Sequence, residues 1–181
     1  MITRSLFILS VSALPALAQA KKATVAEPSP VANVRTLWKQ TADYLVAAAN
    51  EVPEGTYSFR PTPDVRTFGE LIGHVAGSQN MFCAVALGEA PPAEDAVEKA
   101  AKTKAALIDA LRKSNDNCAR AYKQTDKESA GEADLFGNKR SRFYVLLQNA
   151  THDGEHYGNI VTYMRMNKMV PPSSKPPAGG N

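Results

Sequence analysis

The sequence is poor in the residue types that carry much of protein chemistry, because its 181 residues include only three histidines, two cysteines and one tryptophan. Cys83 and Cys118 lie too far apart for a C-x-x-C motif, so neither a redox dithiol nor a cysteine zinc site is expected. No glycine-rich phosphate loop and no Ser-His-Asp arrangement can be recognised. What remains for the two cysteines is a disulfide or a pair of buried thiols.

The chain also lacks a strong charge of either sign, since 21 basic and 18 acidic residues leave a formal net charge of +3. No lysine- and arginine-rich run is interleaved with aromatic residues. Proteins that bind nucleic acid usually carry a basic patch of that kind. We therefore expect no nucleic-acid partner.

The most apolar run is short and lies at the start of the chain. Residues 6–17 read LFILSVSALPAL, come after Arg4, and precede Ala-Gln-Ala at 18–20. A basic start, a run too short to span a bilayer and a small-x-small site are typical of a cleaved secretory signal. The alternative, a buried N-terminal helix, is disfavoured by Pro15. We therefore expect residues 1–20 to be a signal peptide, the protein to be periplasmic or secreted, and, because no cysteine lies near the cleavage site, no stable membrane anchor.

Four later segments carry apolar residues at the spacing of amphipathic helices. The second begins with a capping box, in which Thr67 is followed three residues later by Glu70, and runs to Gly88. No strand pattern of any length and no internal repeat is found. After a linker at 21–30, the sequence predicts an all-α fold, a four-helix bundle over 31–170, with helices at 31–52, 68–88, 97–124 and 142–168. The Pro/Gly-rich tail at 171–181 is expected to be disordered.

The spacing of the three histidines suggests that they belong to one site. His152 and His156 form H-x-x-x-H in the last predicted helix, where residues four apart share a face and can chelate one metal ion. Two ligands make a weak site, and no Asp, Glu or His follows His156, so His74 in the second helix is the imidazole that can complete it. Three histidines leave a coordination position open for water or substrate, as in catalytic rather than structural metal sites.

Two other interpretations of these histidines compete with the metal site. The sequence HDGEH differs from the zincin motif H-E-x-x-H by Asp153, but zincins take their third ligand from residues further downstream, and none is available here. A histidine considered alone is more often an ordinary core or surface residue than a ligand. The i, i+4 pair favours the metal site over this simpler interpretation.

The second and fourth predicted helices resemble those of the DinB-like (DinB/YfiT) superfamily of metal-binding bundles. The resemblance rests on TFGELIGHVAGSQNMF at 67–82, with its capped start and its histidine, and on H-x-x-x-H followed by Gly158 and Asn159. It covers roughly residues 30–170. Members usually have Arg or His after the second histidine of the pair, where this chain has Tyr157.

The resemblance implies that His74, His152 and His156 bind a divalent metal ion, commonly zinc or nickel. It also implies an up-down-down-up bundle in which the second and third helices run parallel. Cys83 and Cys118 would then lie at similar heights and could form a disulfide. In an antiparallel hairpin the two would be about 35 Å apart along the axis, so the disulfide and this topology are expected together.

Characterised members of this superfamily are S-transferases and isomerases that use low-molecular-weight thiols, and many others are assigned as metal-dependent hydrolases. The resemblance implies no DNA binding. We therefore expect a metal-dependent hydrolase or transferase with a small-molecule substrate. The alternatives are a non-catalytic metal- or small-molecule-binding module and a plain structural bundle, and a homodimer is left open.

Three polar residues near the histidine pair are candidates for supporting roles. Glu155 could act as a base only if it points at the metal, and its position in the helix favours a surface carboxylate. Gln148 and Asn159 share the histidine face and could orient the ligands, or they are ordinary buried amides. No catalytic residue is assigned from the sequence.

Overall fold

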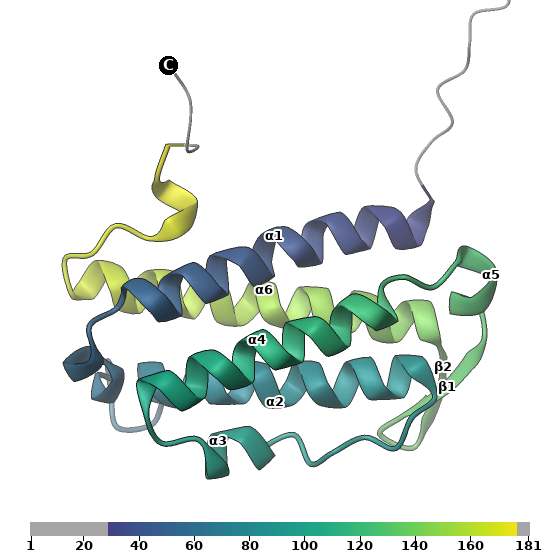
Figure 1. Cartoon of the computed structure of the whole chain (residues 1–181), viewed down its shortest axis with the longest axis horizontal. Coiled ribbons are helices and arrows are strands. Elements are labelled where there is room, and N and C mark those ends of the chain that lie inside the picture. Colours follow the sequence, from purple (N-terminus) through teal and green to yellow (C-terminus); the bar gives the residue numbers. More distant parts are fainter. Residues whose placement is uncertain (1–28, 177–181) are drawn as a thin grey trace, which may run out of the picture.

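The computed structural model describes residues 29–176 as a bundle of four long helices with short elements in the connections (Figure 1). The expected signal peptide at 1–20, most of the linker at 21–30, and residues 177–181 lie outside the described residues. Between residues 29 and 176, none of the helices is long and apolar enough to cross a membrane.

Side-chain caps define where each long helix begins. The four helices are α1 (Pro30–Glu51), α2 (Phe68–Leu87), α4 (Lys104–Ala121) and α6 (Arg142–Met166). Each starts after a Ser or Thr whose hydroxyl accepts a hydrogen bond from an amide of the first turn. The capping box expected at Thr67 is complete, because Glu70 also accepts from the Thr67 amide. α2 ends at Gly88, which takes the left-handed conformation that favours glycine (φ 76°).

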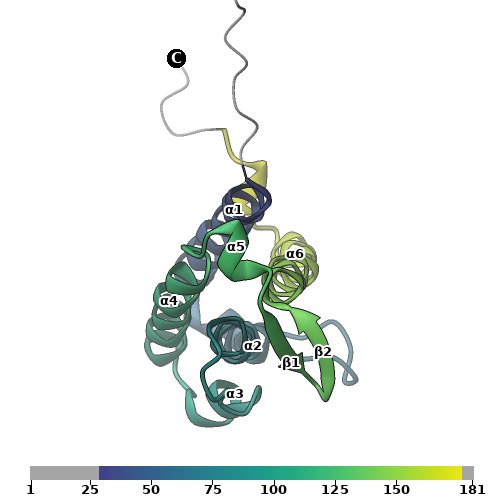
Figure 2. The same cartoon turned by 90° about the vertical axis from the view of Figure 1, so that its right-hand side faces the viewer.

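Contacts between the helices give the up-down-down-up topology that the resemblance implied. Three side-chain contacts rise together in sequence number along α2 and α4, so these two helices run parallel. The contacts are Gln79–Ser114, Asn80–Asn117 and Cys83–Cys118. α1 and α6 run in the opposite direction (Figure 1), and Figure 2 shows the four helices around a common core.

One disulfide and a set of aromatic contacts join all four helices. Cys83 of α2 and Cys118 of α4 are fully buried and bonded, with Cα atoms 5.1 Å apart, so the expected disulfide is confirmed. Trp38 of α1 stacks on Tyr122 at the end of α4, with ring centroids 4.5 Å apart. The Tyr122 hydroxyl in turn donates to the backbone carbonyl of Leu146 in α6.

The third predicted helix, 97–124, is interrupted in the structure. A short helix, α3 (Ala96–Ala100), ends first, and α4 begins at Lys104. The physical reason is Thr103, which has an extended backbone and caps a new helix. α3 therefore belongs to the long connection from α2 to α4, which lies along α2 (Figure 1).

The connection between the third and fourth predicted helices, where the sequence shows no strand pattern, contains regular structure. It holds α5 (Asp126–Ser129) and an antiparallel hairpin of β1 (Glu132–Leu135) and β2 (Asn138–Ser141). Phe136 and Gly137 form the two-residue turn, and both have positive φ, as tight hairpin turns require. The strands are four residues long and mostly polar, so they give no alternating apolar pattern.

Two short 3-10 helices remain, η1 (Glu54–Ser58) between α1 and α2, and η2 (Pro172–Ser174) after α6. η2 lies in the tail that is expected to be disordered at 171–181. There the Ser173 amide donates to the Tyr157 hydroxyl of α6, which holds this part of the tail against the bundle.

Candidate metal centre

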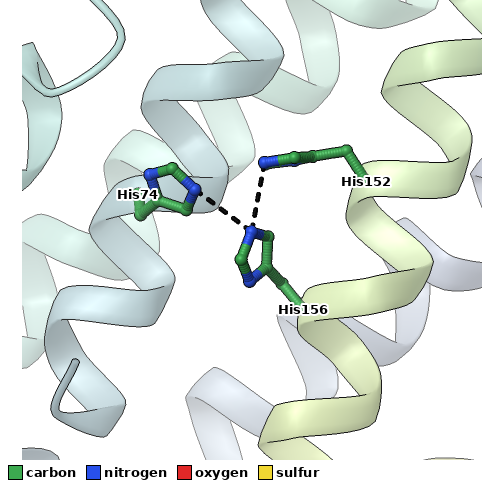
Figure 3. A group of neighbouring side chains, drawn as sticks. All are labelled: His74, His152 and His156. Atoms are coloured by element: carbon green, nitrogen blue, oxygen red, sulfur yellow. Dashed lines mark hydrogen bonds between the residues drawn. The ribbon is translucent and has the colours of Figure 1, made fainter. Parts of the chain in front are cut away.

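The three histidines converge between α2 and α6 (Figure 3). Nε2 of His156 lies 3.1 Å from Nε2 of His74 and 3.1 Å from Nε2 of His152. One nitrogen from each ring lies within 4.8 Å of the other two. The convergence expected from the sequence is therefore present, across a sequence separation of 82 residues between His74 and His156.

The packing of α2 against α6 explains how the rings meet. His152 and His156 lie one turn apart on the side of α6 that faces α2, and His74 projects toward them from α2 (Figure 3). The three ring centroids are 4.4 to 5.1 Å apart. Phe82 lies edge-on to His152 at 5.6 Å and covers one side of the group. His74 and His156 are buried and His152 is half-buried.

Burial favours the neutral form of all three imidazoles. It lowers the pKa of His74 and that of His152 to about 4, and it also lowers the pKa of His156. The positive charge of Arg66 further lowers the pKa of His74. At neutral pH each ring therefore keeps a free lone pair, which is the form that binds a metal ion.

The hydrogen bonding of the rings fits a metal ion better than a closed network. The Nε2 atom of a neutral imidazole carries one proton or one lone pair, so His156 cannot form good hydrogen bonds to both of its neighbours. The Nδ1 atoms of all three rings are buried without a hydrogen-bond partner. Ligands about 2.0–2.1 Å from a tetrahedral ion lie roughly 3.3 Å apart, close to the observed separations. Three Nε2 atoms could thus hold one divalent ion.

Two glutamates from the connection between α2 and α4 flank His74. Glu94 Oε1 lies 3.9 Å from His74 Nε2, and Glu98 Oε2 lies 3.9 Å from His74 Nδ1. The connection comes this close because a Cβ at Gly77 would overlap the Glu94 carbonyl oxygen, and one at Gly73 would lie 2.9 Å from the Glu98 Cα. The sequence reading missed both glutamates, and the glycine pair around His74 is the signal that could have found them.

A cavity of about 760 Å³ opens beside the histidines and reaches His156. It is lined largely by residues 60–66 and by the last turns of α6. Arg60 and Arg66 lie in this lining, and each is paired with a glutamate. The Tyr163 hydroxyl donates to the backbone carbonyl of Arg66 and so attaches this loop to α6. A small polar molecule can reach His156 from this side.

The residues considered for supporting roles lie mostly at the surface. Glu155 is exposed, which confirms its interpretation as a surface carboxylate. Asn159 is exposed and lines the cavity, and Gln148 is half-buried, so neither is a fully buried amide. Neither forms a hydrogen bond to a ring Nδ1 atom. The orienting role considered for Gln148 and Asn159 is therefore not realised in this arrangement.

Asp153, which stands where a zincin has its glutamate, does not belong to the histidine group. Its carboxyl is fully buried, with the side chains of Gln79 and Trp38 as polar neighbours. Burial raises the pKa of this carboxyl well above its usual range. The position belongs to the bundle core, which agrees with rejecting the zincin interpretation.

Comparison with known proteins identifies one family. The family model of the DinB superfamily matches residues 37–160, well over half of the chain. Among curated proteins none matches the chain.

Several solved structures share the fold. A DinB-like protein from Bacillus cereus gives a TM-score of 0.67 at 17% identity, over 77% of this chain and 93% of that one. A DinB-like protein from Bacillus subtilis gives 0.62 at 19% identity, over 76% of this chain and 93% of its own. The mycothiol-dependent maleylpyruvate isomerase gives 0.58 at 16% identity, over 75% of this chain and 66% of its own. At these identities the likeness shows the fold alone.

Proposed function

The chain belongs to the DinB superfamily, and from this premise we propose that it is an exported metal-dependent hydrolase or transferase that acts on a small molecule. The metal would be held by His74, His152 and His156. The observation that carries the proposal is the convergence of three Nε2 atoms, with separations of 3.1 Å, in a buried position beside a cavity. Zinc and nickel are the divalent ions we expect, because both accept imidazole ligands.

The residues around the site support binding of a substrate as well as of an ion. A divalent ion bound here would polarise a substrate carbonyl and activate a nucleophile. The cavity of about 760 Å³ is of the size that small-molecule sites have. Arg60 and Arg66 in its lining offer planar guanidinium groups that can pair with a carboxylate of the substrate, in competition with their present glutamate partners.

Hydrolysis and group transfer differ in the nucleophile. The isomerase with the same fold is described as mycothiol-dependent, which supports a thiol as co-substrate in this family of structures. Export through the signal at 1–20 would take this protein away from cytosolic thiols, and this favours water as the nucleophile. We therefore place hydrolysis first and thiol transfer second.

The test begins with the purified mature protein. Elemental analysis is expected to find about one zinc or nickel ion per chain, and an exchange of His152 for alanine (H152A) is expected to abolish this content. A panel of ester, amide and thiol-adduct substrates is then assayed with chelator and after metal is restored. Turnover that follows the metal supports the enzyme, and metal without turnover on any substrate supports the non-catalytic binding module instead. A wild-type protein that neither contains nor takes up metal contradicts the proposal.

A further inference from the structure

Glu94 stands beside the one histidine that α2 contributes, and we propose that it is the acidic residue of the metal centre, a carboxylate that faces the ion without ligating it. The inference rests on the proposed metal function. Three neutral imidazoles bring no negative charge, so an ion bound by them alone would keep its full double charge in a largely buried place, which is electrostatically costly. A carboxylate close to the ion reduces that cost.

The distances separate Glu94 from the ligands. Its Oε1 lies 3.9 Å from His74 Nε2, the same nitrogen that faces His156. This separation is longer than the 3.1 Å between Nε2 of His156 and Nε2 of each of the other two rings. Glu94 is also not a member of the group whose donor atoms all lie within 4.8 Å of one another. The carboxylate is therefore one layer outside the histidines.

Contacts with α2 fix the position of the Glu94 side chain. The hydroxyl of Ser78, one turn after His74 and fully buried, donates to Glu94 Oε1 at 2.9 Å. The absence of a side chain at Gly77 lets the backbone of Glu94 lie directly on the helix. One surface of α2 therefore carries three features of the site. His74 is the ligand, Gly77 is the contact for the Glu94 backbone, and Ser78 is the donor to the Glu94 carboxylate.

The charge of Glu94 is free to act on the site. Glu98, which lies near Nδ1 of His74, already forms an ion pair with Arg66. Within residues 29–176, the only ion pair of Glu94 is the one with His74. A carboxylate in this position would also accept the proton of an attacking water or thiol, a role that the sequence analysis considered for Glu155 but did not favour.

The test compares E94Q with E89Q in the full mature chain. Glu89 lies in the same connection, but it pairs with Arg120 of α4 on the surface. Zinc affinity is measured by competition with a chromophoric chelator, and cobalt(II) absorption reports the ligand set. We expect E94Q to weaken zinc binding about 10–100-fold, as loss of an outer carboxylate does, and E89Q to stay within about twofold of wild type. The cobalt spectrum of E94Q should keep the band positions and intensity of the wild type, because no ligand is lost.

A second variant, S78A, keeps the carboxylate but removes its buried donor, and should weaken zinc binding by less than E94Q does. Equal zinc affinities of E94Q and E89Q would overturn the proposal, and so would a changed cobalt spectrum in E94Q, which would make Glu94 a ligand. Melting curves of the metal-free variants check that each is folded. Failure of the metal function itself is distinguishable, because wild type and H156A would then bind zinc alike.

Discussion

Cys83, which is bonded to Cys118 of α4, lies on α2, the same helix that presents His74 to the metal centre. α2 contacts α4, to which the disulfide joins it, and it contacts α6 through the histidines. It also contacts α3 through its own glycines, Gly73 and Gly77. Most of its residues are buried, as expected for a helix surrounded by protein on nearly every side. The position of His74 therefore depends on how firmly its helix is held.

The disulfide is expected to stabilise the bundle substantially. It closes a loop with a sequence separation of 35, and the chain-entropy model gives about 3–4 kcal/mol for such a loop. The double variant C83A/C118A should lower the free energy of unfolding in urea by about that amount. Zinc affinity should fall only slightly, because α2 is also held by its contacts with α6.

Thiol titration provides the direct check on this bond. The denatured, non-reduced mature protein is expected to show no free thiols, and reduction should release two per chain. Two thiols before reduction would contradict the bond. A double variant with the urea stability of the wild type would leave the bond in place but contradict its energetic role.

Each histidine should matter for metal binding. H74A, H152A and H156A remove one of three converging nitrogens and should each weaken zinc binding by at least about 100-fold, since two imidazoles make a weak site. Losses at positions 152 and 156 should be of comparable size. Competition titration measures them, and H74A with wild-type affinity would exclude the three-histidine site.

Metal should be retained to a lower pH than unperturbed histidines would allow. Free imidazole competes for protons near pH 6.5, but burial lowers the pKa of His74 and of His152 to about 4. We therefore expect bound metal per chain, measured after desalting, to be nearly unchanged between pH 7.5 and pH 5 and to fall near pH 4. Half of the metal lost between pH 7 and pH 6 would show that the rings are more accessible than the structure indicates.

The metal-free protein should show the matching effect on stability. Between about pH 6.5 and pH 4 the unfolded chain binds protons at these histidines and the folded chain does not, so the contribution of the histidines to the free energy of unfolding should decrease as the pH falls. Urea unfolding at several pH values measures this slope. The slope should be smaller in H74A, which lacks one of the groups.

The sequence predicted those features that local chemistry determines. The capping box at Thr67 and Glu70 placed the start of α2 correctly, and the spacing of His152 and His156 placed both on one face of α6. The involvement of His74 followed because no other imidazole was available. The disulfide could be expected only together with the parallel course of α2 and α4, which came from a family resemblance.

Features that depend on contact between distant segments escaped the sequence. Glu94 reaches the site because the connection lies on Gly77, and neither residue carries a recognisable motif. The break before Thr103 was hidden by helix-forming residues on both sides of it. The hairpin around Phe136 depends on a two-residue turn rather than on apolar alternation.

Export can be checked on the protein itself. When the full sequence is expressed with its first residues in a bacterial host, the mature protein is expected to begin at Lys21, after the small-x-small site at 18–20. Intact mass spectrometry of the periplasmic or secreted fraction decides this. A protein recovered only from the cytoplasm, with residues 1–20 still attached, would contradict export.

The buried carboxyl of Asp153 should contribute to stability with the opposite sign to the histidines, because its contribution decreases as the pH rises. Burial raises its pKa well above the usual range, although the neighbouring side chains of Gln79 and Trp38 act in the opposite direction. A raised folded-state pKa means that the folded chain holds a proton that the unfolded chain has released, so the contribution of Asp153 to stability falls with increasing pH from about pH 4 up to the folded-state pKa.

The variant D153N removes this ionisation while nearly conserving the side-chain volume, so its stability advantage over wild type should grow with pH. Between pH 4.5 and pH 8 this advantage should grow by at least about 1.4 kcal/mol, which corresponds to a shift of one pKa unit. The control is D109N, at an exposed position of α4, whose difference from wild type should hardly change with pH. Urea unfolding of the three proteins between pH 4.5 and pH 8 gives the comparison, and a D153N protein that is less stable than wild type at pH 8 would mean that the carboxylate is ionised and paired in the core.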